Sequence, residues 1–287
     1  MRLLLFAALS LATPAVGQAL PAALAADPPR DAAHPARLEQ IRYPTDGVDV
    51  PARLFVASGA GVHPTVLLLH GFPGTELNLD LARVLQRAGW NVLAIHYRGV
   101  WGAPGSFSFS HTVADAHAAL AWLRSPVAAA YGVDPRRIVA VGHSMGGFDT
   151  VMLGDDRALV GYVLISAANM ASSAQAAGWS AAKRADFADE ASYTNASVDQ
   201  LAADAQAHAA EWNWAKRAAM MAGRPVLVLT SDDGLAADGD AVVAAIRKAG
   251  GPGATAVHMT TDHSYNDHRV ALATTIAQWL GANVPQR

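Results

Sequence analysis

The chain of 287 residues contains no cysteine, which excludes disulfide bonds, thiolate zinc sites and a cysteine nucleophile. Charged residues are scarce, at 16% of the chain against about 25% in an average soluble domain. Neither sign of charge dominates, because 21 basic and 24 acidic residues give a net charge of −3. This balance excludes a strongly basic chain that binds nucleic acid through its phosphates. With 52% hydrophobic residues, the composition is that of an ordinary globular enzyme.

The N-terminus has the pattern of a secretory signal peptide. Arg2 precedes a short apolar run at residues 3–12, and small residues lead up to Gly17. The run is much shorter than the roughly 20 apolar residues that cross a bilayer, so no stable membrane anchor is expected. We expect residues 1–17 to be a signal peptide and the Ala- and Pro-rich residues 18–37 to be a disordered leader. The mature protein is then secreted or periplasmic; the alternative is a poorly ordered cytosolic N-terminus.

From residue 38 to 287 the sequence predicts one α/β domain. Two alternating segments flank Asp46-Gly47 and predict an antiparallel hairpin of residues 38–43 and 48–56. Six short apolar runs follow, as is typical of strands buried in a parallel sheet. These runs are residues 65–69, 92–96, 138–141, 162–165, 226–229 and 256–259. Helical spacing between them predicts a mostly parallel eight-stranded sheet with helices on both faces, one of which we expect to begin at Thr112.

One segment interrupts this alternation. Residues 168–222 lie between the sixth and seventh predicted strands and are Ala-rich and helical in pattern. Ser197 and Gln200 have the spacing of a capping box at the start of one helix. We expect this insertion to form a helical cap over a site at the strand ends.

The strongest chemical signal is the sequence Gly142-His143-Ser144-Met145-Gly146. It follows a predicted buried strand and precedes a segment compatible with a helix, which is the context of a nucleophile elbow. Glycines on both sides let the chain turn sharply and expose the serine hydroxyl. A dinucleotide-binding loop would need glycine in place of Ser144, and a phosphate-binding loop would end in Gly-Lys-Ser or Gly-Lys-Thr. Ser144 is therefore the candidate nucleophile.

A serine nucleophile needs a base to take its proton and an acid to orient that base. Asp232 and Asp233 follow the seventh predicted strand, and His263 follows the eighth. We favour Asp233 over its neighbour, with Asp238 as a weaker alternative acid. We also favour His263 over His268, which we expect to lie in the last helix.

The oxyanion site should be formed by main-chain N–H groups. The loop His70-Gly71-Phe72-Pro73-Gly74 follows the first predicted parallel strand, and its glycines allow close approach to a substrate. We expect the N–H groups of Phe72 and Met145 to be the donors, the alternative for this loop being an ordinary Pro-Gly turn.

Aromatic side chains are the candidates for substrate binding, with core packing as the alternative. The candidates are Trp101, Phe107, Phe109, Trp179, Trp212 and Trp214. No H-E-x-x-H spacing occurs, and we expect neither a metal nor another cofactor.

These motifs resemble those of the α/β-hydrolase superfamily over essentially the whole chain from about residue 38. Tyr97-Arg98-Gly99 with Trp101-Gly102 and Pro104-Gly105 is similar to a loop of dienelactone-hydrolase-like and prolyl-oligopeptidase-like enzymes. The resemblance implies Ser144 as nucleophile, His263 as general base, Asp233 as orienting acid, and Phe72 and Met145 as oxyanion donors. The acid loop lacks the glycine that usually follows its strand, which is a departure from the family's pattern.

The function expected from the sequence is that of an exported serine hydrolase that cleaves small-molecule carboxylic esters through an acyl-enzyme on Ser144. A peptidase or amidase with the same triad is the nearest alternative. A non-catalytic binding protein on the same fold is the alternative from a different class. No nucleic acid partner is expected.

Overall fold

The computed structural model describes residues 21–171, 180–251 and 253–284. The proposed signal peptide and Trp179 lie outside these residues. Within the described ranges, no helix combines the length and apolarity that crossing a bilayer requires.

A single eight-stranded sheet forms the centre of the molecule, with the order β1-β2-β4-β3-β5-β6-β7-β8. Strands β1 and β2 form the predicted hairpin, β2 also runs antiparallel to β4, and all other neighbours are parallel. The strands are β1 (Arg37–Thr45), β2 (Val48–Val56), β3 (His63–Leu69), β4 (Asn91–Ile95), β5 (Val133–His143), β6 (Leu159–Ile165), β7 (Val226–Thr230) and β8 (Thr255–His258). The predicted fold class is confirmed.

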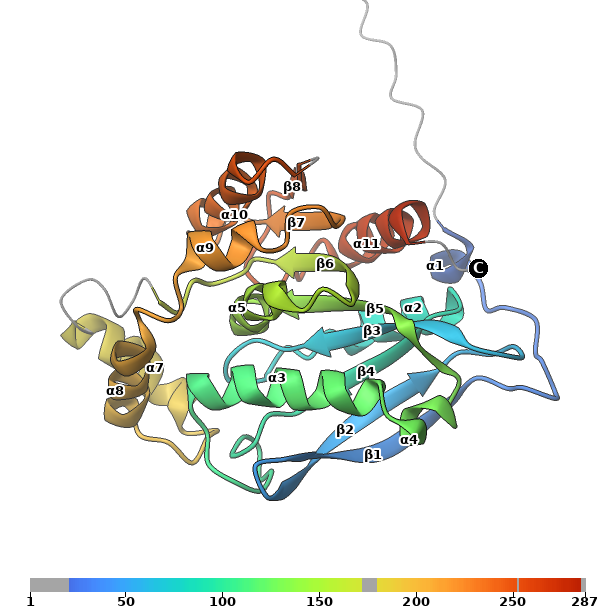
Figure 1. Cartoon of the computed structure of the whole chain (residues 1–287), viewed down its shortest axis with the longest axis horizontal. Helices are drawn as coiled ribbons and strands as arrows, with labels where there is room; N and C mark the ends of the chain where they lie inside the picture. Colours follow the sequence, from blue (N-terminus) through green and yellow to red (C-terminus); the bar gives the residue numbers. More distant parts are fainter. Residues whose placement is uncertain (1–20, 172–179, 252, 285–287) are drawn as a thin grey trace, which may run out of the picture.

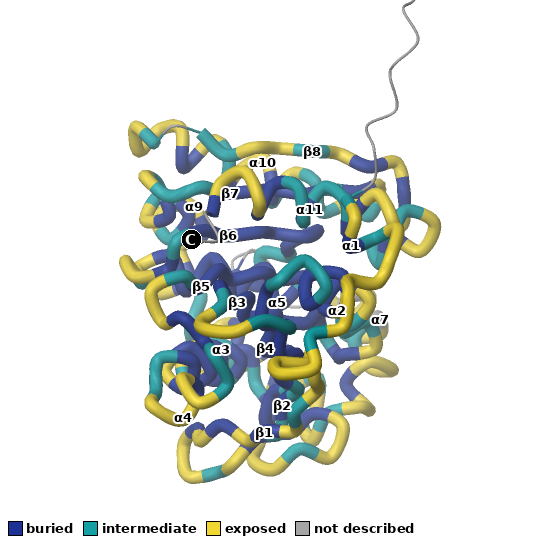
Figure 2. Tube along the Cα trace, turned by 90° about the vertical axis from the view of Figure 1, so that its right-hand side faces the viewer, coloured by how far each residue is buried: buried dark blue, intermediate teal, exposed yellow. Residues whose placement is uncertain are grey.

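Helices cover both faces of this sheet (Figure 1). They are α1 (Ala22–Ala25), α2 (Leu79–Arg87), α3 (Phe109–Leu123), α4 (Pro126–Ala129), α5 (Met145–Met152), the 3-10 helix η1 (Leu153–Asp155), α7 (Ala181–Ala191), α8 (Val198–His208), α9 (Trp214–Ala219), α10 (Ala236–Lys248) and α11 (Arg269–Asn283). Alternate residues of β3 separate two hydrophobic cores. Leu67 belongs to the core that includes α3 and α5, whereas Leu68 belongs to the core that includes α2 and α11. Figure 2 shows the central strands as buried, while β8 is largely exposed at the edge.

Helix α3 starts earlier than predicted. Ser108 is its N-cap, and its hydroxyl accepts a hydrogen bond from the N–H of His111 at 3.1 Å. Thr112 instead lies within the helix, where its hydroxyl oxygen is 2.8 Å from both Phe109 O and Oδ1 of Asp149, to either of which it can donate its proton. Ser and Thr are both good capping residues, so the sequence pattern did not distinguish the two positions.

The segment expected to be a disordered leader differs from that expectation in its described part. Helix α1 buries Ala23, and the Arg87 guanidinium donates to the Ala23 carbonyl at 2.7 Å. These contacts attach the helix to the core on the α2 and α11 face.

The segment between β6 and β7 contains α7, α8 and α9. Figure 1 shows α7 and α8 beyond the carboxyl ends of the parallel strands. The capping box at the start of α8 is present, with both hydrogen bonds between Ser197 and Gln200. Asn195 attaches this segment to the loop after β4: its side chain accepts from Phe107 N at 2.9 Å and donates to Gly105 O at 2.7 Å. The cap is therefore held against the main domain at a defined point.

Candidate active site

Ser144 occupies a sharp turn between β5 and α5. Its φ of 55° and ψ of −118° place it in a backbone conformation that is costly for a residue with a side chain. Its N–H donates to Ile165 O at 2.9 Å, which attaches the turn to the end of β6. The fold thus places the serine hydroxyl at the carboxyl edge of the sheet.

The two glycines of the motif are required by space. A Cβ on Gly142 would lie 1.9 Å from Gly146 O, and a Cβ on Gly146 would lie 2.1 Å from Leu69 O. Both distances are far shorter than any real contact, so a side chain at either position would force the backbone to move. The Gly-x-Ser-x-Gly spacing is therefore a packing requirement of the turn.

Asp233 and His263 are brought together by the loops that follow β7 and β8. Nδ1 of His263 lies 2.7 Å from Oδ2 of Asp233, whose side chain is only 3% exposed. Burial alone would raise the pKa of Asp233. Hydrogen bonds from His263 and from the Leu235 N–H outweigh it, so the pKa of Asp233 is held below its usual range. The carboxylate therefore stays ionised beside the imidazole.

A cluster of buried hydroxyl groups lies behind Asp233, and sequence reasoning missed it. Ser166 Oγ lies 2.9 Å from Ser231 Oγ and 3.1 Å from Tyr265 Oη. Hydrogen bonds from Ser166 and Ser231 contribute to the lowered pKa of Asp233. The available signal was position, because Ser166 and Ser231 each directly follow a parallel strand, β6 and β7, and these strands are neighbours.

The alternative acids and the alternative base have other hydrogen-bond partners. Asp232 points away from His263 and pairs with His258 at 3.0 Å, with 56% of its side chain exposed. Asp238 accepts a hydrogen bond from Asn169 N at 2.8 Å. His268 precedes α11 and pairs with the exposed Asp267 at 2.8 Å. Of the candidate pairs, the structure brings together Asp233 and His263.

His143 supports the loop that carries His263. Its Nε2–H donates to the His263 carbonyl at 2.9 Å, and the two rings lie 4.7 Å apart. Burial, together with the charge of the neighbouring His263, lowers the pKa of His143 to about 3. His143 is thus a neutral, buried ring that packs against His263.

Ser144 and His263 line the same cavity, which has a volume of about 270 Å³. The other lining residues are Phe72, Met145, Ala168, Asn169, Met170, Phe187, Glu190, Leu235 and Asp238. Phe187 comes from the cap helix α7 and packs on Phe72 with ring centroids 5.4 Å apart. The cap therefore contributes directly to the wall of the cavity.

The loop expected to supply an oxyanion donor passes directly over the serine. A Cβ on Gly71 would lie 2.9 Å from Ser144 Cβ and 3.4 Å from Ser144 Oγ. Only a residue without a side chain allows this approach. Phe72 is the next residue in the sequence, and both Phe72 and Met145 line the cavity.

Most of the aromatic residues predicted to bind substrate have other positions, so that prediction is corrected. Phe107 is buried and packs on Phe72, which itself lines the cavity. Trp212 is buried against Phe148 with ring centroids 5.0 Å apart. Trp101 lines a different cavity, described below.

Two of the other aromatic candidates are also core residues, and the third, Trp179, lies outside the described residues. Phe109 is fully buried, and Trp214 is buried on Phe148 with its Nε1–H donating to Asp238 O at 3.1 Å. Packing explains this outcome, because large aromatic rings bury more apolar area than other side chains and so attach the cap to α5. The sequence pattern and the composition do not distinguish an aromatic residue that packs in the core from one that contacts substrate.

No group of three or more His, Asp or Glu side chains in the described part of the chain is arranged to hold a metal ion. The residues that line the cavity include Ser144, with its hydroxyl group, and His263, whose imidazole is bound to the Asp233 carboxylate.

An elbow serine after a parallel strand, followed along the chain by an acid and then a histidine in the loops after later strands, is characteristic of the α/β-hydrolase class of proteins. The chain belongs to the alpha/beta hydrolase family, whose family model matches residues 66–282. No curated protein matches the chain significantly.

Solved structures of esterases share this fold. The carboxylesterase EstE1, cloned from a metagenomic library, is 22% identical with a TM-score of 0.60, over 86% of this chain and 90% of that chain. The esterase of the archaeon Pyrobaculum calidifontis is 20% identical with a TM-score of 0.64, over 87% of both chains. The acylaminoacyl peptidase of Pyrococcus horikoshii is 12% identical with a TM-score of 0.66, over 87% of this chain and 42% of that chain. At these identities the similarity is one of fold.

Proposed function

We propose that this protein is a serine hydrolase that cleaves carboxylic esters of small molecules through an acyl-enzyme on Ser144. One observation carries the proposal: the His263 imidazole is bound to Asp233 at one ring nitrogen and lines the same cavity as Ser144. A histidine held in this way can take the proton of a serine that attacks a carbonyl group.

The proposed reaction has two halves. Ser144 Oγ forms a bond to the ester carbonyl carbon while His263 takes its proton, and the carbonyl oxygen becomes an oxyanion. The N–H groups of Phe72 and Met145 are the proposed donors to this oxyanion, and one such donor lowers a barrier by about 3 kcal/mol. His263 then returns the proton to the leaving alcohol as the carbon–oxygen bond breaks. In the second half, His263 takes a proton from a water molecule whose oxygen forms a bond to the acyl carbon. The bond between that carbon and Ser144 Oγ then breaks, and His263 returns the proton to Oγ, which releases the acid and restores the serine hydroxyl.

The cavity supports short, uncharged acyl groups as substrates. Its volume of about 270 Å³ is slightly below the range of about 300–1,000 Å³ that is usual for ligand sites. The carboxyl-bearing residues Glu190 and Asp238 are part of its lining, and like charge in a binding site disfavours an anionic group. We therefore expect acetyl and butyryl esters to be cleaved faster than octanoyl esters or esters of dicarboxylic acids.

A peptidase or amidase with the same three residues is the second candidate. It is kept because the similar structures include an acylaminoacyl peptidase as well as esterases. The attack on the carbonyl carbon is common to both reactions, so the leaving group decides between them.

The test compares p-nitrophenyl esters of increasing chain length with aminoacyl p-nitroanilides, for the intact chain and for Ser144→Ala. We expect ester cleavage to dominate, and the Ser144→Ala variant to lose several orders of magnitude in kcat. Ser106→Ala, a change at an exposed serine elsewhere, is the matched control and should leave the rate unchanged. A fluorophosphonate probe should label the wild type and fail to label Ser144→Ala. Ester cleavage at the wild-type rate by that variant, or absence of labelling, would overturn the assignment.

We also propose that the protein is exported, on the strength of its N-terminal pattern. N-terminal sequencing of the protein recovered from the periplasm or the medium should then begin close to residue 18. Recovery of the uncleaved chain only from the cytosol would contradict this.

A further inference from the structure

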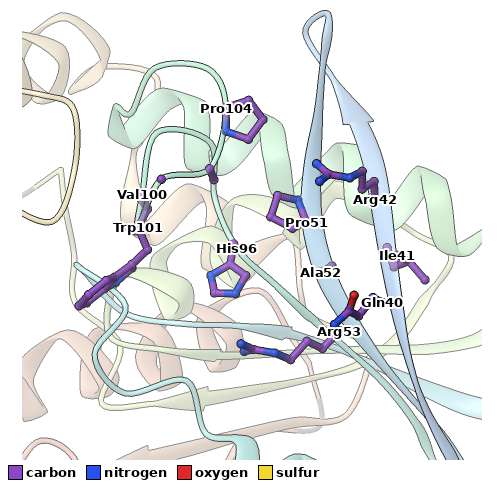
Figure 3. Close-up of a pocket in the computed structure, with 12 residues that line it drawn as sticks. Gln40, Ile41, Arg42, Pro51, Ala52, Arg53, His96, Val100, Trp101 and Pro104 are labelled. Atoms are coloured by element: carbon purple, nitrogen blue, oxygen red, sulfur yellow. The ribbon is translucent and has the colours of Figure 1, made fainter.

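A second, larger cavity lies on the outer face of the β1–β2 hairpin. Its volume is about 760 Å³, and its walls come from β1, β2, the residue after β4 and the loop of residues 100–104 (Figure 3). It shares no lining residue with the cavity of Ser144. Nothing in the proposed hydrolysis uses this cavity.

Strand register explains why polar groups gather there. Gln40 lies opposite Arg53 in the hairpin, and Arg42 lies opposite Pro51, so all four side chains project from the same face. The intervening Ile41 faces the core and is buried. The hairpin thus has one apolar face in the core and one face that carries two guanidinium groups.

These two guanidinium groups give the cavity a positive charge. None of its twelve lining residues is acidic, and within the described part of the chain no carboxylate lies within 4.0 Å of Arg42 or Arg53. By contrast, Arg98 and Arg124 each bind an aspartate, at 2.7 and 2.6 Å. Among the residues that the structure describes, the one hydrogen-bond acceptor of Arg42 is a main-chain carbonyl, that of Asp49, at 3.2 Å.

A rigid aromatic ring forms another part of the wall. The Trp101 side chain is 51% exposed, yet its Nε1–H donates to Pro73 O at 3.0 Å and its ring stacks on Tyr193 at 4.6 Å. The ring is therefore held in place, with Tyr193 stacked on it and about half of the residue still exposed. An exposed and fixed indole can stack on a planar ligand without losing much side-chain freedom.

His96 lies between the arginine and the indole. In Figure 3, Arg53 reaches from β2 toward His96 and Trp101, whereas Arg42 reaches toward Pro51 and Pro104. Nδ1 of His96 is buried and makes no hydrogen bond within the described part of the chain. Burial and the charge of Arg53 lower the pKa of His96, so its ring is neutral and adds no positive charge of its own to the cavity.

We propose that this cavity binds a small planar carboxylate, an aromatic acid, with its carboxylate on Arg53 and its ring at Trp101. A guanidinium group offers parallel N–H donors that match the two oxygens of a carboxylate. The aromatic surface then discriminates an aromatic acid from a simple anion. Binding at this site is independent of the proposed reaction at Ser144, so either proposal can fail without the other.

Isothermal titration of the intact protein with benzoate, benzamide, acetate and inorganic phosphate tests the proposal. We expect benzoate to bind at least tenfold more tightly than benzamide, which has the same shape without the charge, and than acetate or phosphate. Arg53→Gln should weaken benzoate binding at least tenfold, and Trp101→Ala should weaken it several-fold. Arg136→Gln, at a guanidinium that is 87% exposed elsewhere, is the matched control and should bind benzoate as the wild type does.

Three results would overturn the proposal. Equal binding of benzoate and benzamide would show that charge plays no part. Equal binding of acetate, phosphate and benzoate would show a general anion site without a ring subsite. Unchanged benzoate binding in Arg53→Gln, with a wild-type circular dichroism spectrum, would show that the acid binds elsewhere.

Discussion

Replacement of Asp233 by asparagine, with Asp232→Asn as its neighbour control, is the sharpest test of the proposed triad. The two aspartates are adjacent, yet only Asp233 reaches His263, at 2.7 Å and with its side chain 3% exposed. An asparagine at this position would keep the shape of the side chain but lose the negative charge that stabilises an imidazolium ion. Its NH₂ group could also bind Nδ1 of His263 and stabilise the tautomer that cannot accept the serine proton.

The expected magnitude is large. Loss of the carboxylate from a triad of this kind lowers kcat by about four orders of magnitude. Since each factor of ten is about 1.36 kcal/mol, this corresponds to about 5.5 kcal/mol of barrier. Asp232→Asn removes only an exposed pair with His258, and exposed pairs contribute about 0–1 kcal/mol. Its kcat should therefore remain within a few-fold of the wild-type value.

The assay is kcat for p-nitrophenyl acetate at pH 8, with thermal unfolding measured for both variants to exclude a loss of structure. The reasoning is refuted if Asp232→Asn loses the activity and Asp233→Asn keeps it. It is equally refuted if both folded variants keep the wild-type rate.

Three further predictions concern the surroundings of the site. Ser166→Ala removes a hydrogen bond to Asp233, so we expect kcat to fall about tenfold with KM nearly unchanged. An unchanged kcat would show that Ser166 does not help to position the Asp233 carboxylate. Gly146→Ala should prevent folding or lower the free energy of unfolding by several kcal/mol, because its Cβ would lie 2.1 Å from Leu69 O. A Cβ on Gly281 would meet nothing within 4 Å, so Gly281→Ala should raise the free energy of unfolding, measured in urea, by about 0.5–1 kcal/mol. Burial lowers the pKa of His70 to about 4 and that of His143 to about 3, so below pH 6.5 the unfolded chain binds protons that the folded chain does not. The free energy of unfolding should therefore fall as the pH drops from about 6.5 to 4, by about 3 kcal/mol from His70 alone, and a urea midpoint that stays constant over this range would contradict it.

Much of the candidate site followed from the order of motifs along the chain. Parallel strands place their carboxyl ends at one edge of the sheet, so residues directly after successive strands become neighbours. Ser144 directly follows β5, and Asp233 and His263 lie in the loops after β7 and β8, so their approach to one edge of the sheet was predictable. The hydroxyl groups of Ser166 and Ser231 obey the same rule, but their residue type has no distinctive chemistry and so drew no attention.

The choice between neighbouring or similar residues depended on tertiary contacts. Asp232 and Asp233 are identical in type and adjacent, and only the path of the loop after β7 turns one inward to His263 and the other outward to His258. Likewise, Phe187 lines the cavity, whereas Trp212 packs in the core. Both are aromatic residues of one helical insertion, and no local pattern distinguishes them.

Short-range information sufficed for the eight strands, the elbow turn and the capping box at Ser197, because each depends on residues that are close in sequence and on alternation that repeats along an element. The orientation of the acid, the wall of the cavity and the charged outer face of the hairpin depend on which segments pack together. Such contacts join residues far apart in the sequence, as in the hydrogen bond between His143 and the carbonyl of His263, 120 positions apart, and they exist only once the sheet has formed.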